Sequence, residues 1–164
     1  MSMTLPASFP LSMSQIAAEL GLSLPLKMDN VNGTHGWLTY LAGIQTAGRL
    51  PPPGTFSISF SQLLGKTAHF NGNLTGQGAG PTLVVSFSGA PFFGGNLNTL
   101  SQQSSALSLS FSVPPYFLGN ILVTNTTFGT GAVLTKQDEF TWTGTGNVVP
   151  SNTQTTNITI YPST

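Results

Sequence analysis

The chain has 164 residues, a formal net charge of zero and no cysteine, and only 5% of its residues are charged, against about 25% in a typical soluble domain. A nucleic-acid partner would need a basic patch to neutralise phosphates, and with four Lys and Arg residues in all the sequence has none, so we expect no nucleic-acid partner. The absence of cysteine excludes disulfides and the usual zinc sites. Ser, Thr, Asn, Gln and Gly replace charge at the surface, which suits a protein held in an assembly.

The chain begins without the marks of export or membrane insertion. Residues 1–11 lack the basic segment and apolar core of a signal peptide, and no apolar stretch approaches the roughly 20 residues of a membrane helix. We therefore expect neither Sec-dependent export nor membrane insertion.

A short helix is predicted directly after Leu11. Ser12 and Gln15 have the spacing of a capping box. In such a box the serine hydroxyl accepts from a backbone N–H in the first turn, and the glutamine side chain accepts from the backbone N–H of the serine. Ile16 and Leu20 then fall on one face, and Gly21 is placed to end the helix.

The same signal returns further along, because ISFSQL (residues 58–63) repeats the pattern of LSMSQI (residues 11–16). Ser59 and Gln62 repeat the capping spacing, Leu63 and Leu64 supply the apolar face, and Gly65 follows. A proline-rich connector precedes this second copy, and a weaker helix signal lies around residues 37–42. These serines lack the G-x-S-x-G setting of a hydrolase nucleophile, so the capping interpretation is favoured over catalysis.

We interpret residues 1–66 as an attachment module, with a docking face formed by Ile16, Leu20, Leu63 and Leu64. After Lys66 the apolar pattern changes to a period of two, and residues 67–164 are predicted to form a β domain. Its strand candidates are short, rich in β-branched and aromatic residues, and separated by Gly, Pro, Asn and Ser. They are residues 68–70, 83–87, 106–111, 121–123, 132–134, 140–142 and 157–161.

The predicted fold class is mainly β: a small N-terminal module with short helices, followed by an antiparallel, immunoglobulin-like β-sandwich. A small barrel is the alternative. Residues 76–80 and 94–105 are predicted to be loops.

Few side chains could carry chemistry. Between Thr67 and Thr135 the chain has no Lys, Arg, Asp or Glu. Asp138 and Glu139 are adjacent, so they would point to opposite faces of a strand and could not flank a scissile bond; a solvated hairpin turn with Lys136 is favoured. The segment from Asp29 to Gly36 lacks the spacing of a calcium loop. No catalytic residue, metal ligand or cofactor is therefore assigned.

Aromatic residues near predicted loops are the remaining candidates for a binding surface. Phe92 and Phe93 stand between Pro91 and two glycines, and Tyr116 and Phe117 follow two prolines. Such aromatics can stack on sugars or anchor a protein interface. The alternative is that they close the end of the β domain.

Three stretches, LSMSQIAAELG, ISFSQLLGK and GNILVTNTTFGTGAVLTKQDEFTWTG, resemble segments that recur in tail-tip, tail-fibre and other virion proteins of tailed bacteriophages. Residues 5–16 also follow the usual opening of those proteins, although Phe9 stands where they have Gly. The resemblance covers residues 1–66 well and the strands after Leu118 moderately, and it carries no catalytic residues.

The resemblance implies a non-enzymatic structural protein of a virion, assembled in the host cytoplasm as a homo-oligomer. Residues 1–66 would dock to other virion structural proteins, and the β domain would be exposed, at a tail tip or fibre. Two non-enzymatic alternatives stay open: a receptor-binding module for a host-surface glycan, and a capsid decoration protein. A depolymerase is disfavoured because the chain lacks a spaced carboxylate pair.

Overall fold

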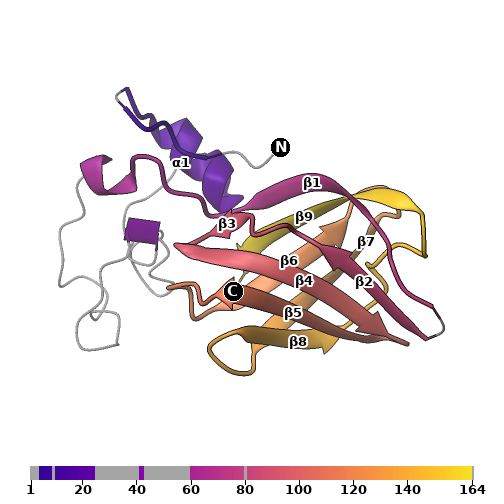
Figure 1. Cartoon of the computed structure of the whole chain (residues 1–164). Coiled ribbons are helices and arrows are strands. Elements are labelled where there is room, and N and C mark those ends of the chain that lie inside the picture. Colours follow the sequence, from indigo (N-terminus) through magenta and orange to yellow (C-terminus); the bar gives the residue numbers. More distant parts are fainter. Residues whose placement is uncertain (1–3, 9, 25–40, 43–59, 80, 164) are drawn as a thin grey trace.

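The computed structural model describes residues 4–8, 10–24, 41–42, 60–79 and 81–163. These residues include the α-helix α1, the 3₁₀ helix η1 and an antiparallel sheet of nine strands (Figure 1). The helices are α1 (Met13–Leu20) and η1 (Phe60–Leu63). The strands are β1 (Phe70–Thr75), β2 (Thr82–Ser86), β3 (Pro91–Phe92), β4 (Gly95–Gln103), β5 (Ala106–Val113), β6 (Asn120–Asn125), β7 (Thr130–Lys136), β8 (Thr141–Thr145) and β9 (Thr155–Ser163).

The sheet curls into a nearly closed barrel. Eight strands follow the order β1-β9-β6-β7-β8-β5-β4-β2, and β3 pairs with β4 off this path. The two end strands of the path meet again just beyond β1, where Gln77 and Val84 exchange two backbone hydrogen bonds of 2.8 Å. The order β9-β6-β7-β8 places the fourth strand beside the first of three consecutive ones, which is a Greek key.

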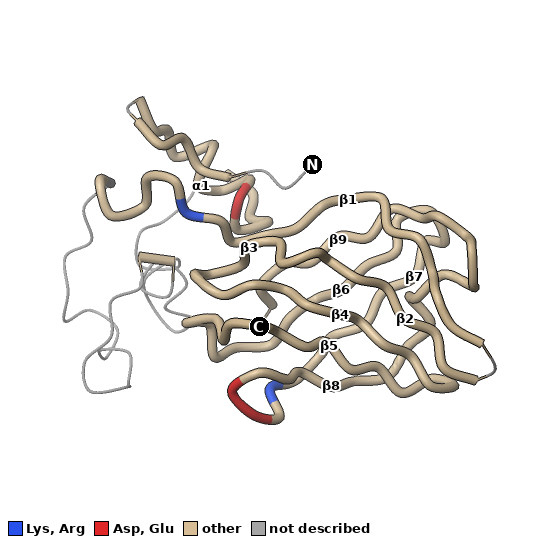
Figure 2. The backbone as a smooth tube through the Cα atoms, in the orientation of Figure 1, with Lys and Arg blue, Asp and Glu red and all other residues tan. Residues whose placement is uncertain are grey.

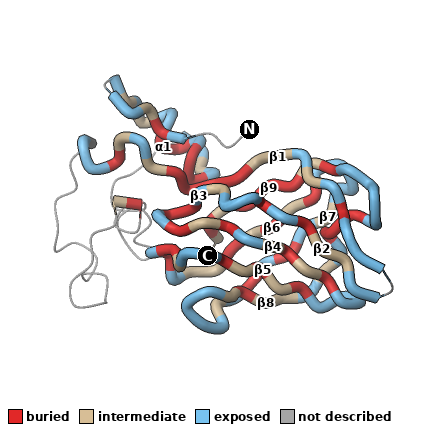
Figure 3. Tube along the Cα trace, in the orientation of Figure 1, coloured by how far each residue is buried: buried red, intermediate tan, exposed pale blue. Residues whose placement is uncertain are grey.

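Buried and more exposed residues alternate along several strands, as in β5 and β6 (Figure 3). In β5, Leu107, Leu109 and Phe111 are buried, while Ser108 and Ser110 face outward. This strand was predicted over residues 106–111 and is confirmed. The other strand candidates also overlap observed strands, although the candidate at residues 68–70 meets β1 only at its last residue.

The prediction of a loop over residues 94–105 is wrong, because β4 occupies most of it. The pairing of β4 with β5 shifts register on both sides of Leu97, between Asn96 and Thr99. This irregularity lets Leu97 and Leu100, three residues apart, both be buried. A strand with a bulge does not show a strict period of two, so the pattern missed it.

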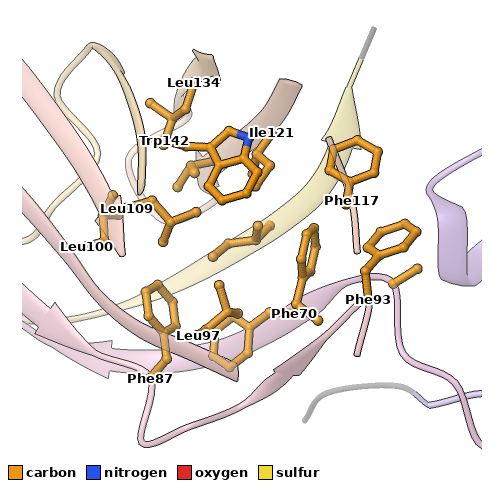
Figure 4. Close-up of a cluster of buried hydrophobic side chains, with 14 of the residues drawn as sticks. Phe70, Phe87, Phe93, Leu97, Leu100, Leu109, Phe117, Ile121, Leu134 and Trp142 are labelled. Atoms are coloured by element: carbon orange, nitrogen blue, oxygen red, sulfur yellow. The ribbon is translucent and has the colours of Figure 1, made fainter. Parts of the chain in front are cut away.

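The core fills the barrel around Trp142, which lies near Leu134 and Ile121 (Figure 4). Its indole N–H donates to the carbonyl of Gly119 (2.8 Å), and its ring packs edge-on against Phe111 at a centroid distance of 5.0 Å. The buried indole therefore has both apolar contacts and a hydrogen-bond acceptor.

Two buried amides fasten the segment between β8 and β9. The side-chain oxygen of Gln102 accepts the backbone N–H groups of Val148 and Val149, both at 3.1 Å, and its amide nitrogen donates to Asn147 (3.0 Å). From β6, the Asn125 amide donates to the carbonyl of Val148 (2.9 Å). Val148 and Val149 are thereby held in the core.

The predicted first helix is confirmed with its cap. The Ser12 hydroxyl accepts from the N–H of Gln15 (3.3 Å), and the Gln15 side chain accepts from the N–H of Ser12 (2.7 Å). Gly21 ends the helix at φ +67°, in the left-handed region that glycine tolerates.

The second cap is only partly within the described residues. Ser59 lies outside them, while Gln62 and Leu63 belong to η1 and Gly65 follows at φ +68°. The Ser59–Gln62 capping box therefore stays a prediction. Of the weaker helix signal around residues 37–42, only Leu41 and Ala42 are described, and both are helical.

The mainly β, antiparallel prediction is confirmed. The immunoglobulin-like sandwich is not confirmed. The strands follow a nearly closed path, which is closer to the alternative prediction of a small barrel. Within the described residues, no helix is long and apolar enough to cross a membrane.

Candidate functional site

The N-terminal segment contacts the barrel through both polar and apolar groups. We call residues 4–24 the arm, and residues 63–69 together with Tyr161 the arm site. The two run side by side through backbone hydrogen bonds from Leu5 to Lys66 and from Gly65 to Pro6, both 2.9 Å. The hydroxyls of Thr4 and Thr67 also lie 2.9 Å apart.

The apolar face of the arm belongs to the core of the chain itself. Leu5, Ile16 and Leu20 are buried in one cluster with Leu63 and the barrel side chains. Ile16, Leu20 and Leu63, predicted as part of a docking face, are therefore covered by the chain itself in this structure. Leu64 is half-buried. The spacing identified the apolar face correctly but not what covers it.

Glu19 lies on this buried face, with 1% of its surface exposed. One carboxylate oxygen accepts the backbone N–H of Ala68 and that of His69, the latter at 3.2 Å. The other oxygen lies 3.2 Å from Nδ1 of His69, within ion-pair distance. A buried carboxylate needs such donors, because removal from water otherwise disfavours its charge.

Tyr161 completes the arm site from β9. Its ring stacks on His69 at a centroid distance of 5.0 Å and an interplanar angle of 9°. It also covers Gly21, where a Cβ atom would come within 2.7 Å of the ring. Burial, and then the negative charge of Glu19, raise the pKa of the Tyr161 phenol.

Neither Glu19 nor His69 was among the candidate site residues predicted from the sequence. The sequence does contain a pattern that indicates burial of Glu19, because this residue stands three positions after Ile16 on the same helix face as Leu20. Its pairing with His69 spans 50 positions, which no local pattern shows. Because both side chains are buried between the arm and the barrel, this pair can hold the arm on the barrel.

The four aromatics proposed as surface-binding residues divide into two groups. Phe92, Phe93 and Phe117 are fully buried, so that prediction is wrong for them; Phe93 and Phe117 stack at 4.8 Å at one end of the core (Figure 4). Tyr116 is 37% exposed. The alternative, that these aromatics close the end of the β domain, describes the three phenylalanines.

The outward side of β4, β5 and β8 carries a neutral surface that we call the hydroxyl face. Cross-strand pairing aligns its members in two rows: Thr99, Ser110 and Thr141, then Ser101, Ser108 and Thr143. A shallow groove of about 510 Å³ crosses the second row, between Gln103, Thr135 and Thr145. All residues that line it are uncharged.

Charge is concentrated elsewhere. Of the five charged residues that the structure describes, Lys136, Asp138 and Glu139 share the hairpin between β7 and β8 (Figure 2). Lys136 donates to the backbone carbonyl of Asp138 (2.6 Å) and lies 4.3 Å above the Trp142 ring. Burial lowers the pKa of Lys136 despite the opposing effect of the two carboxylates. The hairpin interpretation of Asp138 and Glu139 is confirmed, and both are exposed.

Among the described residues, no three His, Asp or Glu side chains come together as metal ligands would. Comparisons of the chain with protein-family models, with curated proteins and with solved structures gave no match.

Proposed function

We propose that the chain is a non-enzymatic structural subunit of a tailed-phage virion, at the tail tip or fibre, that assembles as a homo-oligomer with other virion proteins. Its β body, predicted as an immunoglobulin-like sandwich, would face outward. The resemblance of LSMSQIAAELG and the related segments to virion proteins supports the phage context.

The observation that carries the proposal is the neutral outer surface of the barrel. The hydroxyl face presents two rows of serine and threonine, and the five charged residues that the structure describes lie in one hairpin and at the arm and its site (Figure 2). Free soluble proteins usually depend on net charge to keep copies apart. A neutral, hydrogen-bonding surface allows identical copies to pack closely without repulsion.

Mass spectrometry of purified, washed particles tests the proposal. We expect the chain in several copies per particle, and immunogold labelling of a tagged chain should place it on the tail. Labelling of the head would favour capsid decoration instead. Recovery of the chain only from the soluble fraction of infected cells, and not from particles, would contradict the structural role.

A matched pair of variants tests the part played by the neutral surface. Ser108→Asp places a charge in the hydroxyl face, whereas Gln137→Asp adds the same charge to the exposed, already charged hairpin. We expect at least a tenfold loss of incorporation for Ser108→Asp and little change for Gln137→Asp. Equal incorporation of both variants would show that the hydroxyl face is not a packing surface.

The groove on the hydroxyl face supports a second candidate, binding of a neutral host glycan. Its Ser, Thr and Gln side chains match the hydroxyl groups of an uncharged sugar, whereas the buried phenylalanines no longer support this candidate. Binding of the full chain on a glycan array, lost in Thr143→Val but kept in Tyr116→Phe, is the expected result. Absence of binding to any neutral glycan would remove this candidate.

A further inference from the structure

We propose that the arm of one copy can occupy the arm site of a second copy, so that neighbouring copies are joined by exchange of residues 4–24. The inference names the contact by which copies of a structural subunit would interlock. It concerns the chain alone and does not depend on the identity of the particle.

The arm and its site form a complete, two-sided contact. The arm supplies an apolar face with Ile16 and Leu20, the Glu19 carboxylate and a backbone edge at Leu5. The site supplies Leu63, the N–H groups of Ala68 and His69, and the Tyr161 ring. Each partner group comes from one side only, so a second copy can make the same contacts.

The chain between the arm and the barrel has enough residues for the arm to reach a second copy. The arm ends at Leu24, and the next described residue is Leu41, which is buried in the core. The intervening stretch can span about 55 Å when extended. The longest strands of the barrel have nine residues and are about 30 Å long. An arm can therefore cross to a neighbouring barrel while Leu41 stays in its own.

The closed form, with the arm on its own barrel, and the exchanged form are in balance. Exchange replaces each arm contact by an identical one, so the two forms differ little in contact energy. The balance is then set by the concentration of neighbouring copies relative to the effective concentration of the chain's own arm. A dilute chain stays closed, and a crowded assembly favours exchange. The neutral hydroxyl face lets copies approach closely enough for this to occur.

Cysteine cross-linking tests the proposal, because the chain has no cysteine of its own. Thr4 and Thr67 touch through their hydroxyls at 2.9 Å, so cysteines at these positions are close enough to form a disulfide. Chains with Thr4→Cys and chains with Thr67→Cys, tagged to differ in size, are unfolded together, refolded at increasing concentration and oxidised. We expect a disulfide-linked heterodimer whose fraction rises with concentration.

Three controls make the result decisive. Pairing Thr4→Cys with Thr145→Cys, an exposed position on β8, measures random cross-linking and should give at least fivefold less heterodimer. Adding Ile16→Asp to the Thr4→Cys chain should reduce the heterodimer to that level. The double variant Thr4→Cys/Thr67→Cys, refolded at low concentration, should form an internal disulfide.

Heterodimer no greater than in the Thr145→Cys control would overturn arm exchange, as would heterodimer that Ile16→Asp leaves unchanged. Failure of the double variant to form its internal disulfide would also count against the proposal, because the contact itself would then be absent. None of these outcomes bears on incorporation into particles, so the two proposals can fail separately.

Discussion

Glu19 is the residue whose replacement should most weaken the hold of the arm. In Glu19→Ala the two backbone N–H groups of Ala68 and His69 lose their acceptor inside the protein. Each buried donor left unsatisfied costs about 1–3 kcal/mol. We expect the free energy of unfolding, measured by urea denaturation, to fall by about 3 kcal/mol.

The only other glutamate that the structure describes provides the control. Glu139 is exposed in the hairpin, so Glu139→Ala should change the free energy of unfolding by less than about 0.5 kcal/mol. Glu19→Gln keeps one acceptor oxygen and should lie between the two. Equal stability of the two alanine variants would show that the buried carboxylate does not hold the arm.

Tyr161 should make the protein sensitive to alkaline pH. Its pKa is raised above the ordinary value of 10.0, chiefly by burial, so folding favours the neutral phenol. The corresponding stability is complete below pH 10 and is lost as the pH rises through the folded-state pKa. We expect the urea midpoint of the native protein to fall above pH 10 more steeply than that of Tyr161→Phe.

Tyr116→Phe serves as the control for this pH dependence, because it removes a phenol that is 37% exposed. Its urea midpoint should follow the native curve above pH 10. A Tyr161→Phe curve that coincides with the native one would show that the Tyr161 phenol does not contribute to the alkaline loss of stability.

Among the elements of the barrel, the segment between β8 and β9 is held by the side chains of Gln102 and Asn125, and Gln102 is the one that accepts its backbone N–H groups. Gln102→Ala removes the acceptor of the Val148 and Val149 N–H groups and should cost about 3 kcal/mol of unfolding free energy. Its neighbour Gln103 is exposed, and Gln103→Ala should cost less than about 0.5 kcal/mol. Urea denaturation of both variants compares them directly, and similar losses would refute the assignment of Gln102 as the fastening residue.

The elements that the sequence predicted are those specified by local patterns. The Ser12–Gln15 box and the alternation of Leu107, Leu109 and Phe111 each lie within a few residues, so α1 and β5 were recognised. The bulge in β4 breaks that alternation. The contact of Glu19 with His69 depends on packing between distant stretches. Local patterns therefore indicate which residues have an apolar face, but not which partner covers that face.

At the scale of the whole molecule, the division into residues 1–66 and 67–164 stays a prediction, yet the described parts share one hydrophobic core. Full burial of a Leu or Ile side chain stabilises by about 1.5–3 kcal/mol. Leu5, Ile16 and Leu20 together therefore contribute roughly 5–9 kcal/mol, before the entropy cost of ordering the arm. A domain of this size has only about 5–15 kcal/mol in total, so the barrel should be marginal without its arm.

This balance predicts the behaviour of a chain that begins at residue 25. Thermal unfolding followed by circular dichroism should show either no cooperative transition or a Tm at least about 10 °C below that of the full chain, since about 1 kcal/mol shifts Tm by 2–4 °C at this length. A separate peptide of residues 1–24 should restore much of the loss, whereas the same peptide with Ile16→Asp should not. If the truncated chain instead melts at the native Tm, the arm is not part of the core's stability, and the barrel is an independent domain as the sequence first suggested.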